Sequence, residues 1–152
     1  MILAVSLLIP ASAAVAVVLM VVARRRLIVV DVEGLSMQPE YEPGDRVLVR
    51  RGVIPRRGQV VVVKRPAVDL PEWAKPLAVP EERRSVTAQG WMIKRVAGTS
   101  GDSWWSQETG TEHLIPEGHL YLLGDNPERS LDSRLIGLIP VDQLLGTVWK
   151  RL

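Results

Sequence analysis

Apolar residues are distributed along this chain in two different ways, and the first concerns its N-terminal end. Residues 2–23 carry no charged side chain and consist almost entirely of Ala, Val, Leu, Ile and Met. A helix of this length spans about 33 Å, enough to cross the roughly 30 Å hydrocarbon core of a bilayer. Arg24, Arg25 and Arg26 follow directly. The pattern predicts one N-terminal transmembrane helix with a basic flank, residues 1–26.

A cleavable signal peptide is the main alternative for this segment. Such a peptide has a basic start, a shorter apolar core and a small-residue cleavage site. Here the basic residues come after the apolar core, which favours an uncleaved anchor. The same arginines favour a cytoplasmic location for the rest of the chain, because basic flanks tend to stay inside the cell. Long translocated domains can override this bias.

The remaining residues, 27–152, show short β-type runs and no long amphipathic helix. Apolar or alternating runs occur at residues 27–32, 46–50, 59–63, 90–97, 120–123 and 144–149, with Gly- and Pro-containing turns between them. Residues 65–88 hold four prolines and show little periodicity, which is typical of a surface loop. We therefore predict a mainly β fold, with a single domain of short antiparallel strands after the transmembrane helix.

The composition narrows the possible chemistry. No cysteine is present, which excludes a disulfide framework, a thiol nucleophile and a cysteine-based metal site. The formal net charge is only +2, so nucleic acid is not an expected partner. We expect neither a cofactor nor a metal ion.

Ser36 is the leading candidate nucleophile. It lies between Gly34 and Pro39, in a turn-prone loop after the first predicted strand. Such a loop can expose the hydroxyl and leave backbone N–H groups free to hold an oxyanion. A serine also needs a base. One of the two histidines, His119, could act together with Asp125, although no spacing supports a Ser–His–Asp triad.

Lys94 is the second candidate base. On an extended strand Met92, Lys94 and Val96 share one face, so the amine has apolar neighbours. Burial in such a setting lowers a lysine pKa by up to several units from about 10.4, which makes the amine usable as a base near neutrality. The ordinary alternative is a lysine at a strand edge that keeps its amine in water.

Four segments, in order along the chain, resemble the type I signal peptidases (leader peptidases). Residues 32–39 (VEGLSMQP) resemble the nucleophile box, and residues 43–49 (PGDRVLV) resemble the strand that follows it. Residues 93–98 (IKRVAG), continued by Gly101 and Asp102, resemble the general-base box, and residues 124–134 (GDNPERSLDSR) resemble the last box. The resemblance implies a membrane-bound serine endopeptidase with a Ser–Lys dyad and a signal-peptidase-like β domain.

The resemblance also implies roles for individual residues. Ser36 would attack the scissile carbonyl, its backbone N–H would help to hold the oxyanion, and neutral Lys94 would act as general base. Ser130 would hydrogen-bond to the Lys94 amine and orient it. Met37 follows the nucleophile in its box.

Two supporting ion pairs are implied in the same way. Arg95, on the strand face opposite to the base, would pair with Asp125. Asp132 would pair with Arg134 and stabilise the loop of the last box. The substrates implied are exported precursors with small residues before the cleavage site. The catalytic domain would then lie outside the plasma membrane, anchored in the bilayer by one span, which resolves the orientation conflict.

The chain departs from the family pattern at three places. Glu40 stands where the family usually has Thr, residues 127–129 (PER) stand where it usually has Arg-Asp-Asn, and Gly34 offers no hydroxyl to the oxyanion. These departures leave two alternatives open: a maturation protease dedicated to one precursor, and a catalytically inactive, membrane-tethered binding module. Self-cleaving repressors share the Ser–Lys chemistry, but they carry a DNA-binding domain where this chain has its apolar segment.

The five tryptophans raise a separate question, because a domain of this size has little room to bury all of them. Trp prefers membrane interfaces when it is not in a core. The hypothesis is that Trp104 and Trp105 rest on the bilayer near the active site. A position in the core is the alternative.

Overall fold

The structure is a computed structural model that describes residues 26–66, 90–107 and 109–152. In these ranges the chain is mainly β, as predicted from the short apolar runs. The helices in the same ranges are all short, and none has the length and apolar character needed to cross a bilayer. The predicted transmembrane helix and most of the predicted surface loop at 65–88 lie outside the described residues.

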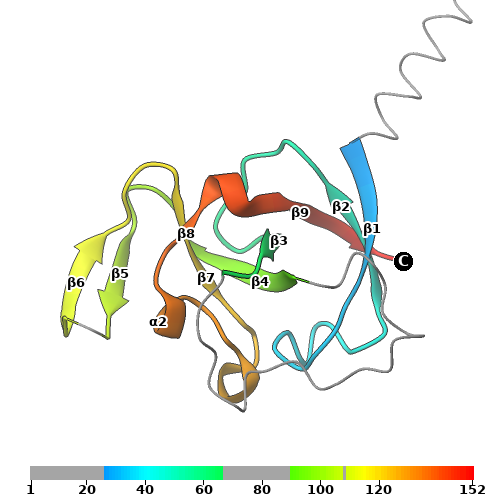
Figure 1. Ribbon diagram of the computed structural model, residues 1–152, viewed down its shortest axis with the longest axis horizontal. Coiled ribbons are helices and arrows are strands. Elements are labelled where there is room, and N and C mark those ends of the chain that lie inside the picture. The colour runs from blue at the N-terminus through cyan, green and yellow to red at the C-terminus, as the bar shows by residue number, and fades with distance from the viewer. Residues whose placement is uncertain (1–25, 67–89, 108) are drawn as a thin grey trace, which may run out of the picture.

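A curled antiparallel sheet forms the body of the domain (Figure 1). Within the described residues it has seven strands, in the order β1-β2-β9-β3-β4-β7-β8. The C-terminal strand β9 lies between β2 and β3, so it joins the first hairpin to the central strands. The strands are β1 (Leu27–Asp31), β2 (Arg46–Arg50), β3 (Val60–Lys64), β4 (Trp91–Gly98), β7 (His119–Leu123), β8 (Ile139–Pro140) and β9 (Leu144–Arg151).

Strand β3 separates two clusters of the hydrophobic core. Its four consecutive valines are all buried, as expected for a strand covered on both faces. Val62 packs in one cluster with Ile93 of β4, and this cluster includes residues of the first hairpin. Val61 and Val63 pack in the other cluster with Leu122 of β7. Both faces of β4 are therefore buried along most of its length.

A two-stranded sheet extends from the main sheet, at the left of Figure 1. It consists of β5 (Ser103–Ser106) and β6 (Thr111–Leu114). The sequence did not predict β6, because its four residues are all exposed and show no buried alternation. Three short helices, η3 (Pro127–Arg129), α2 (Ser133–Ile136) and η4 (Val141–Gln143), lie in the connections on either side of β8.

Candidate active site

Ser36 lies in the loop between β1 and β2, which we call the Ser36 loop (residues 32–45). The residue after it, Met37, is 1% exposed and packs in the core with the first hairpin. Turn hydrogen bonds hold the loop in shape, including the bond from the Tyr41 N–H to the Met37 carbonyl (3.0 Å). Gly34 has a φ of 78°, a conformation that glycine adopts without strain. The buried Met37 therefore anchors a tight loop that leaves Ser36 half-buried.

Lys94 projects from the centre of β4 toward this loop. Its Nζ donates a hydrogen bond of 2.8 Å to the Ser36 Oγ and one of 3.0 Å to the Ile93 carbonyl. Lys94 pairs with Val61 across the β3–β4 ladder and is only 4% exposed. The predicted strand thus places the amine on its apolar face, and the fold brings together two residues that are 58 positions apart in the sequence.

Burial is the main reason that the Lys94 amine loses its proton more readily than an ordinary lysine amine. It lowers the pKa of Lys94 from 10.5 to about 8, because the charged form loses its hydration. Asp132 acts in the opposite direction and raises this pKa, while Arg65 lowers it further. At pH 7 roughly one molecule in ten then carries a neutral amine. An amine in this range is suited to accept a proton from a hydroxyl near neutral pH.

Gly124, directly after β7, allows two segments to meet beside Ser36. A Cβ atom at this position would lie 2.1 Å from the Ser130 Oγ and 2.6 Å from the Ser36 carbonyl oxygen. Two residues further on, the Asn126 N–H donates a hydrogen bond of 3.0 Å to the same carbonyl. Only glycine leaves room for this contact, so the last box of the sequence packs directly against the Ser36 backbone.

Ser130 lies in this contact region and is 2% exposed. Its Oγ makes no hydrogen bond of good geometry within the described part of the chain, although it lies near the Asp132 carboxylate and helps to lower the pKa of that group. The predicted hydrogen bond from Ser130 to the Lys94 amine is thus not formed in this structure. The hydroxyl is buried close to Ser36, and its role toward Lys94 stays a prediction.

The buried Asp132 forms an ion pair with the partly exposed Arg134, next to Gly124. The carboxylate accepts hydrogen bonds from the Arg134 Nε (2.9 Å) and Nη2 (2.6 Å) and from the Gly124 N–H (2.9 Å). Burial alone would raise the pKa of Asp132, but these hydrogen bonds outweigh it and hold the pKa below its usual range. The structure therefore brings these two residues together as predicted, and the pair supports the backbone at Gly124.

Arg95 and Asp125 form the second predicted ion pair. The Arg95 Nε and Nη2 lie 2.8 and 2.7 Å from the two carboxylate oxygens, a bidentate geometry that is among the strongest for such pairs. Arg95 also pairs with Glu40 and donates to the Gly58 carbonyl (2.8 Å). The sequence showed Glu40 only as a departure from the family pattern. A charged residue at that position was the signal that could have revealed the contact.

The histidines lie elsewhere and do not assemble a triad in the described residues. The Nδ1 of His119 is 3.1 Å from the Glu117 carbonyl, in the turn before β7. The Nε2 of His113 is 2.8 Å from the hydroxyls of two threonines on and beside β6. Asp125, the acid that a Ser–His–Asp triad would use, is engaged by Arg95. The Ser–His–Asp alternative therefore has no geometric support.

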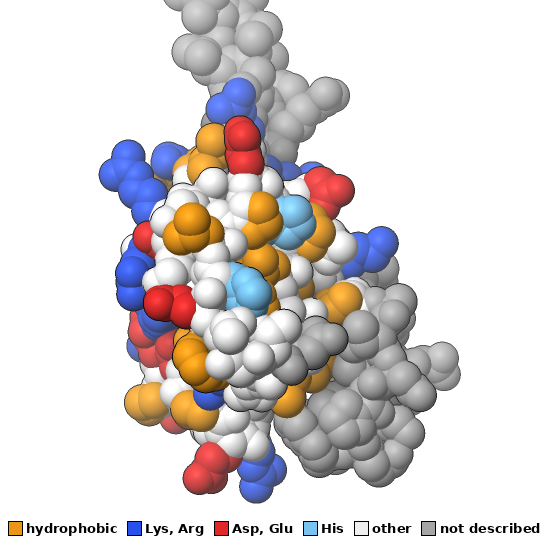
Figure 2. All heavy atoms as spheres, turned by 90° about the vertical axis from the view of Figure 1, so that its left-hand side faces the viewer, with side chains coloured by type: hydrophobic (Ala, Val, Ile, Leu, Met, Phe, Trp, Pro, Cys, Tyr) orange, Lys and Arg blue, Asp and Glu red, His pale blue; other side chains and the backbone are white. Residues whose placement is uncertain are grey.

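The two adjacent tryptophans of β5 point to opposite faces of the small sheet. The Trp104 ring lies 5.5 Å from the Tyr121 ring and 6.1 Å from the His113 ring. Trp105 is 59% exposed, on the same face as Leu114, which is 72% exposed. Figure 2 shows this side of the molecule, with the two histidines among separate apolar side chains. Of these two tryptophans, Trp105 is thus the one that is free to contact a bilayer, whereas Trp104 packs against the domain.

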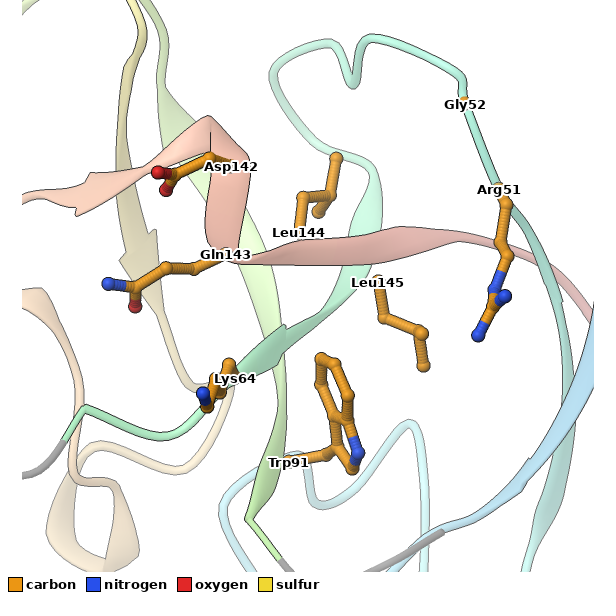
Figure 3. A pocket seen from close by; sticks show the side chains of 8 residues that line it. All are labelled: Arg51, Gly52, Lys64, Trp91, Asp142, Gln143, Leu144 and Leu145. Carbon is orange, nitrogen blue, oxygen red and sulfur yellow. The ribbon is translucent and has the colours of Figure 1, made fainter.

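A hollow of about 360 Å³ lies at the junction of β3, β4 and β9, apart from Ser36 and Lys94 (Figure 3). The side chains of Trp91, Leu145 and Arg51 point toward the same open space. No group of acidic or histidine side chains suited to a metal ion occurs in the described ranges. The lining consists of Arg51, Gly52, Lys64, Trp91, Asp142, Gln143, Leu144 and Leu145.

Comparison with known proteins supports the resemblance seen in the boxes. Residues 2–108 and 103–152 match the sequence profile of the family described as "Signal peptidase, peptidase S26". The chain is 28% identical over 132 residues to mitochondrial inner membrane protease subunit 1 of Mus musculus, covering 82% of this chain and 68% of the relative. It is 30% identical over 130 residues to mitochondrial ATP-independent inner membrane protease subunit 1b of Arabidopsis thaliana, covering 77% and 65%. A profile match over nearly the whole chain shows that this protein belongs to the signal peptidase family, peptidase S26.

Proposed function

We propose that this protein is a membrane-bound serine endopeptidase that removes signal peptides from exported precursors, with Ser36 as nucleophile and Lys94 as general base. The observation that carries the proposal is the 2.8 Å hydrogen bond between a buried lysine amine and the Ser36 hydroxyl. Membership of a peptidase family supports a reaction at a peptide bond. No cofactor takes part, because the pair supplies both nucleophile and base.

The steps follow from the positions of these atoms. Neutral Lys94 accepts the Ser36 proton as the Oγ attacks the scissile carbonyl, and it then gives this proton to the leaving amine. The product is an acyl-enzyme, which a water molecule activated by Lys94 hydrolyses to restore the free hydroxyl. The Ser36 N–H donates to no carbonyl within the described residues, so it is free to stabilise the oxyanion.

The neighbouring residues support this pair without reacting. Asp132 and Arg134 hold the Gly124 backbone, against which the Ser36 carbonyl packs. Ser130 is buried at the same contact, and its proposed role is to hydrogen-bond to the Lys94 amine and orient it. Arg95 and Asp125 join the strand of the base to the last box. Each of these roles is part of the proposal.

The proposed location is the plasma membrane, with one span and the catalytic domain on the extracytoplasmic side. The apolar residues 2–23 supply the anchor in this proposal. The relatives named above are proteases of the mitochondrial inner membrane, which supports membrane attachment in general. Protease protection of the domain in intact cells tests the orientation, and a protected, cytoplasmic domain would contradict export processing.

The reaction is tested by cleavage of a preprotein that carries an Ala-X-Ala site, with purified full-length protein in detergent. We expect cleavage after the small residues by the wild type and none by Ser36→Ala or Lys94→Met. Lys64→Met is the matched control, because Lys64 is an exposed lysine at the end of β3, and it should cleave like the wild type.

Each other outcome of this experiment has a definite meaning. Cleavage that survives Lys94→Met would refute the Ser–Lys mechanism. Acylation of Ser36 by an active-site inhibitor without cleavage of this preprotein would indicate a maturation protease with a narrower substrate. Absence of both reactions in the wild type would favour the inactive binding module.

A further inference from the structure

Glu40 lies four residues after the proposed nucleophile, at the surface of the Ser36 loop. Its carboxylate pairs with the Nη2 of Arg95, and Arg95 follows Lys94 directly in β4. The Lys94 side chain leaves the strand on one face and reaches Ser36, while the Arg95 side chain leaves on the other face and reaches Glu40. The Ser36 loop is thus tied to both faces of the strand that carries the base.

Arg95 extends this connection to the last box. It holds Asp125 by two hydrogen bonds of 2.8 and 2.7 Å, and the neighbouring Asn126 N–H donates to the Ser36 carbonyl. The contacts from Ser36 along the loop to Glu40, through Arg95 to Asp125, and back through Asn126 form a closed ring. Each member of the ring limits the movement of the next.

The main chain of Glu40 is held from another direction. Its carbonyl accepts a hydrogen bond of 3.1 Å from the Nη1 of Arg151, near the end of β9. The same nitrogen lies 3.1 Å from a carboxylate oxygen of Asp45, at the end of the Ser36 loop. Arginines from two strands that are not neighbours in the sheet therefore hold Glu40, one at its carboxylate and one at its carbonyl.

We propose that Glu40 is a positioning residue, which holds the Ser36 loop on β4 so that the Ser36 hydroxyl stays within hydrogen-bond distance of Lys94. The inference deepens the proposed function and rests on it only for the effect on cleavage. Glu40 acts through Arg95 and touches no reacting atom. Positioning matters here because a displacement of 1 Å at a reacting group can lower a rate by about 100-fold.

The exposure of the pair limits the size of the effect. The side chains of Glu40 and Arg95 are 53% and 29% exposed, and ion pairs at such sites contribute modestly because water screens them. Loss of the Glu40 carboxylate should therefore make opening of the loop about two- to fivefold more frequent, without unfolding the domain.

Hydrogen exchange on the full-length protein in detergent tests the contact without any substrate. The amide of Asn126 is the reporter, because its hydrogen bond to the Ser36 carbonyl breaks when the loop moves away. We expect exchange at Asn126 to be about two- to fivefold faster in Glu40→Ala and less accelerated in Glu40→Gln, which can still accept a hydrogen bond from Arg95. The matched control is Glu42→Ala, because Glu42 is an exposed acid of the same loop whose side chain makes no ion pair with the described residues.

Cleavage kinetics supply the second measurement. In Glu40→Ala we expect kcat to fall, by at most the factor by which opening of the loop increases, with KM changed less than about twofold. Unchanged exchange at Asn126 in Glu40→Ala would overturn the inference. Equal acceleration in Glu42→Ala, or equal acceleration at the buried amide of Val62 in β3, would also overturn it, because the effect would then be general destabilisation. Exchange that is faster at Asn126 in Glu40→Ala, together with a wild type that cleaves no precursor, would uphold the positioning role and contradict the proposed function.

Discussion

Replacement of Lys94 by methionine tests whether the proposed base is held in the core at a cost to stability. Lys94 is 4% exposed, and burial lowers its pKa from 10.5 to about 8. Methionine fills a similar volume without a charge. We expect Lys94→Met to lose activity and to change the way in which stability depends on pH.

The size and sign of this change follow from linkage between protonation and folding. Lowering of the Lys94 pKa from 10.5 to about 8 corresponds to roughly 3 kcal/mol. Below pH 8 the amine is protonated in both the folded and the unfolded protein, so the wild type carries the whole cost. Between pH 8 and 10.5 the unfolded state holds the proton and the folded state does not, so stability rises with pH. Above pH 10.5 the rise is complete.

The assay is urea unfolding of both full-length proteins in detergent, followed by fluorescence of the five tryptophans. From pH 7 to pH 9.5 the free energy of unfolding of the wild type should rise by about 2 kcal/mol relative to Lys94→Met. Loss of the hydrogen bonds to Ser36 and Ile93 shifts the whole curve without changing this slope. The exposed Lys64 provides the control, because Lys64→Met should follow the wild type at every pH.

A constant difference between wild type and Lys94→Met across this pH range would refute the reasoning. It would mean that the Lys94 amine keeps its ordinary pKa in the folded protein. The amine would then be solvated, and a neutral lysine could not be the base near pH 7.

Three further predictions concern the same site and the small sheet. The value of kcat/KM for preprotein cleavage should rise with pH to a half-maximum at about 8, as Lys94 loses its proton; a half-maximum near about 6.5 would point to a histidine instead. Gly124→Ala should lower cleavage by about 100-fold or more and destabilise the protein by about 1–3 kcal/mol in urea unfolding. The cause is the new Cβ, which would lie 2.1 Å from the Ser130 Oγ. Cleavage and stability equal to those of the wild type would show that the backbone adapts. Trp105→Ser should lower cleavage in liposomes severalfold and leave it unchanged in detergent micelles, because Trp105 is 59% exposed; equal activity of variant and wild type in both would exclude a contact with the bilayer.

Much of the site was predictable from the sequence because its boxes are local. β-Branched or alternating residues predict each strand next to the site. The alternation of side chains along a strand is enough to place Lys94 and Arg95 on opposite faces. The nucleophile loop needs glycine and proline within a few positions of Ser36. Local steric rules and local spacing carry this information, so the two proposed reactants could be named before their geometry was known.

Other features follow from contacts between segments far apart in the chain. The position of β9 between β2 and β3 depends on pairing of the C-terminal strand with two strands from the first half of the chain. Strand β6 exists because it pairs with β5, since its own residues have no buried pattern. The orientation of Trp105 toward solvent depends on Tyr121, which packs against the ring of its neighbour. No periodic pattern of apolar residues in the sequence predicts such pairings.

The sequence by itself determined the mainly β character, the family and the candidate pair of Ser36 and Lys94. Only the tertiary structure decided that their side chains meet at 2.8 Å, that the Ser130 hydroxyl makes no hydrogen bond to the amine, and that Glu40 joins Arg95. The physical reason is that secondary-structure propensity acts over a few residues. Desolvation of the Lys94 amine and formation of the Glu40–Arg95 ion pair instead require segments separated by more than fifty residues to pack together.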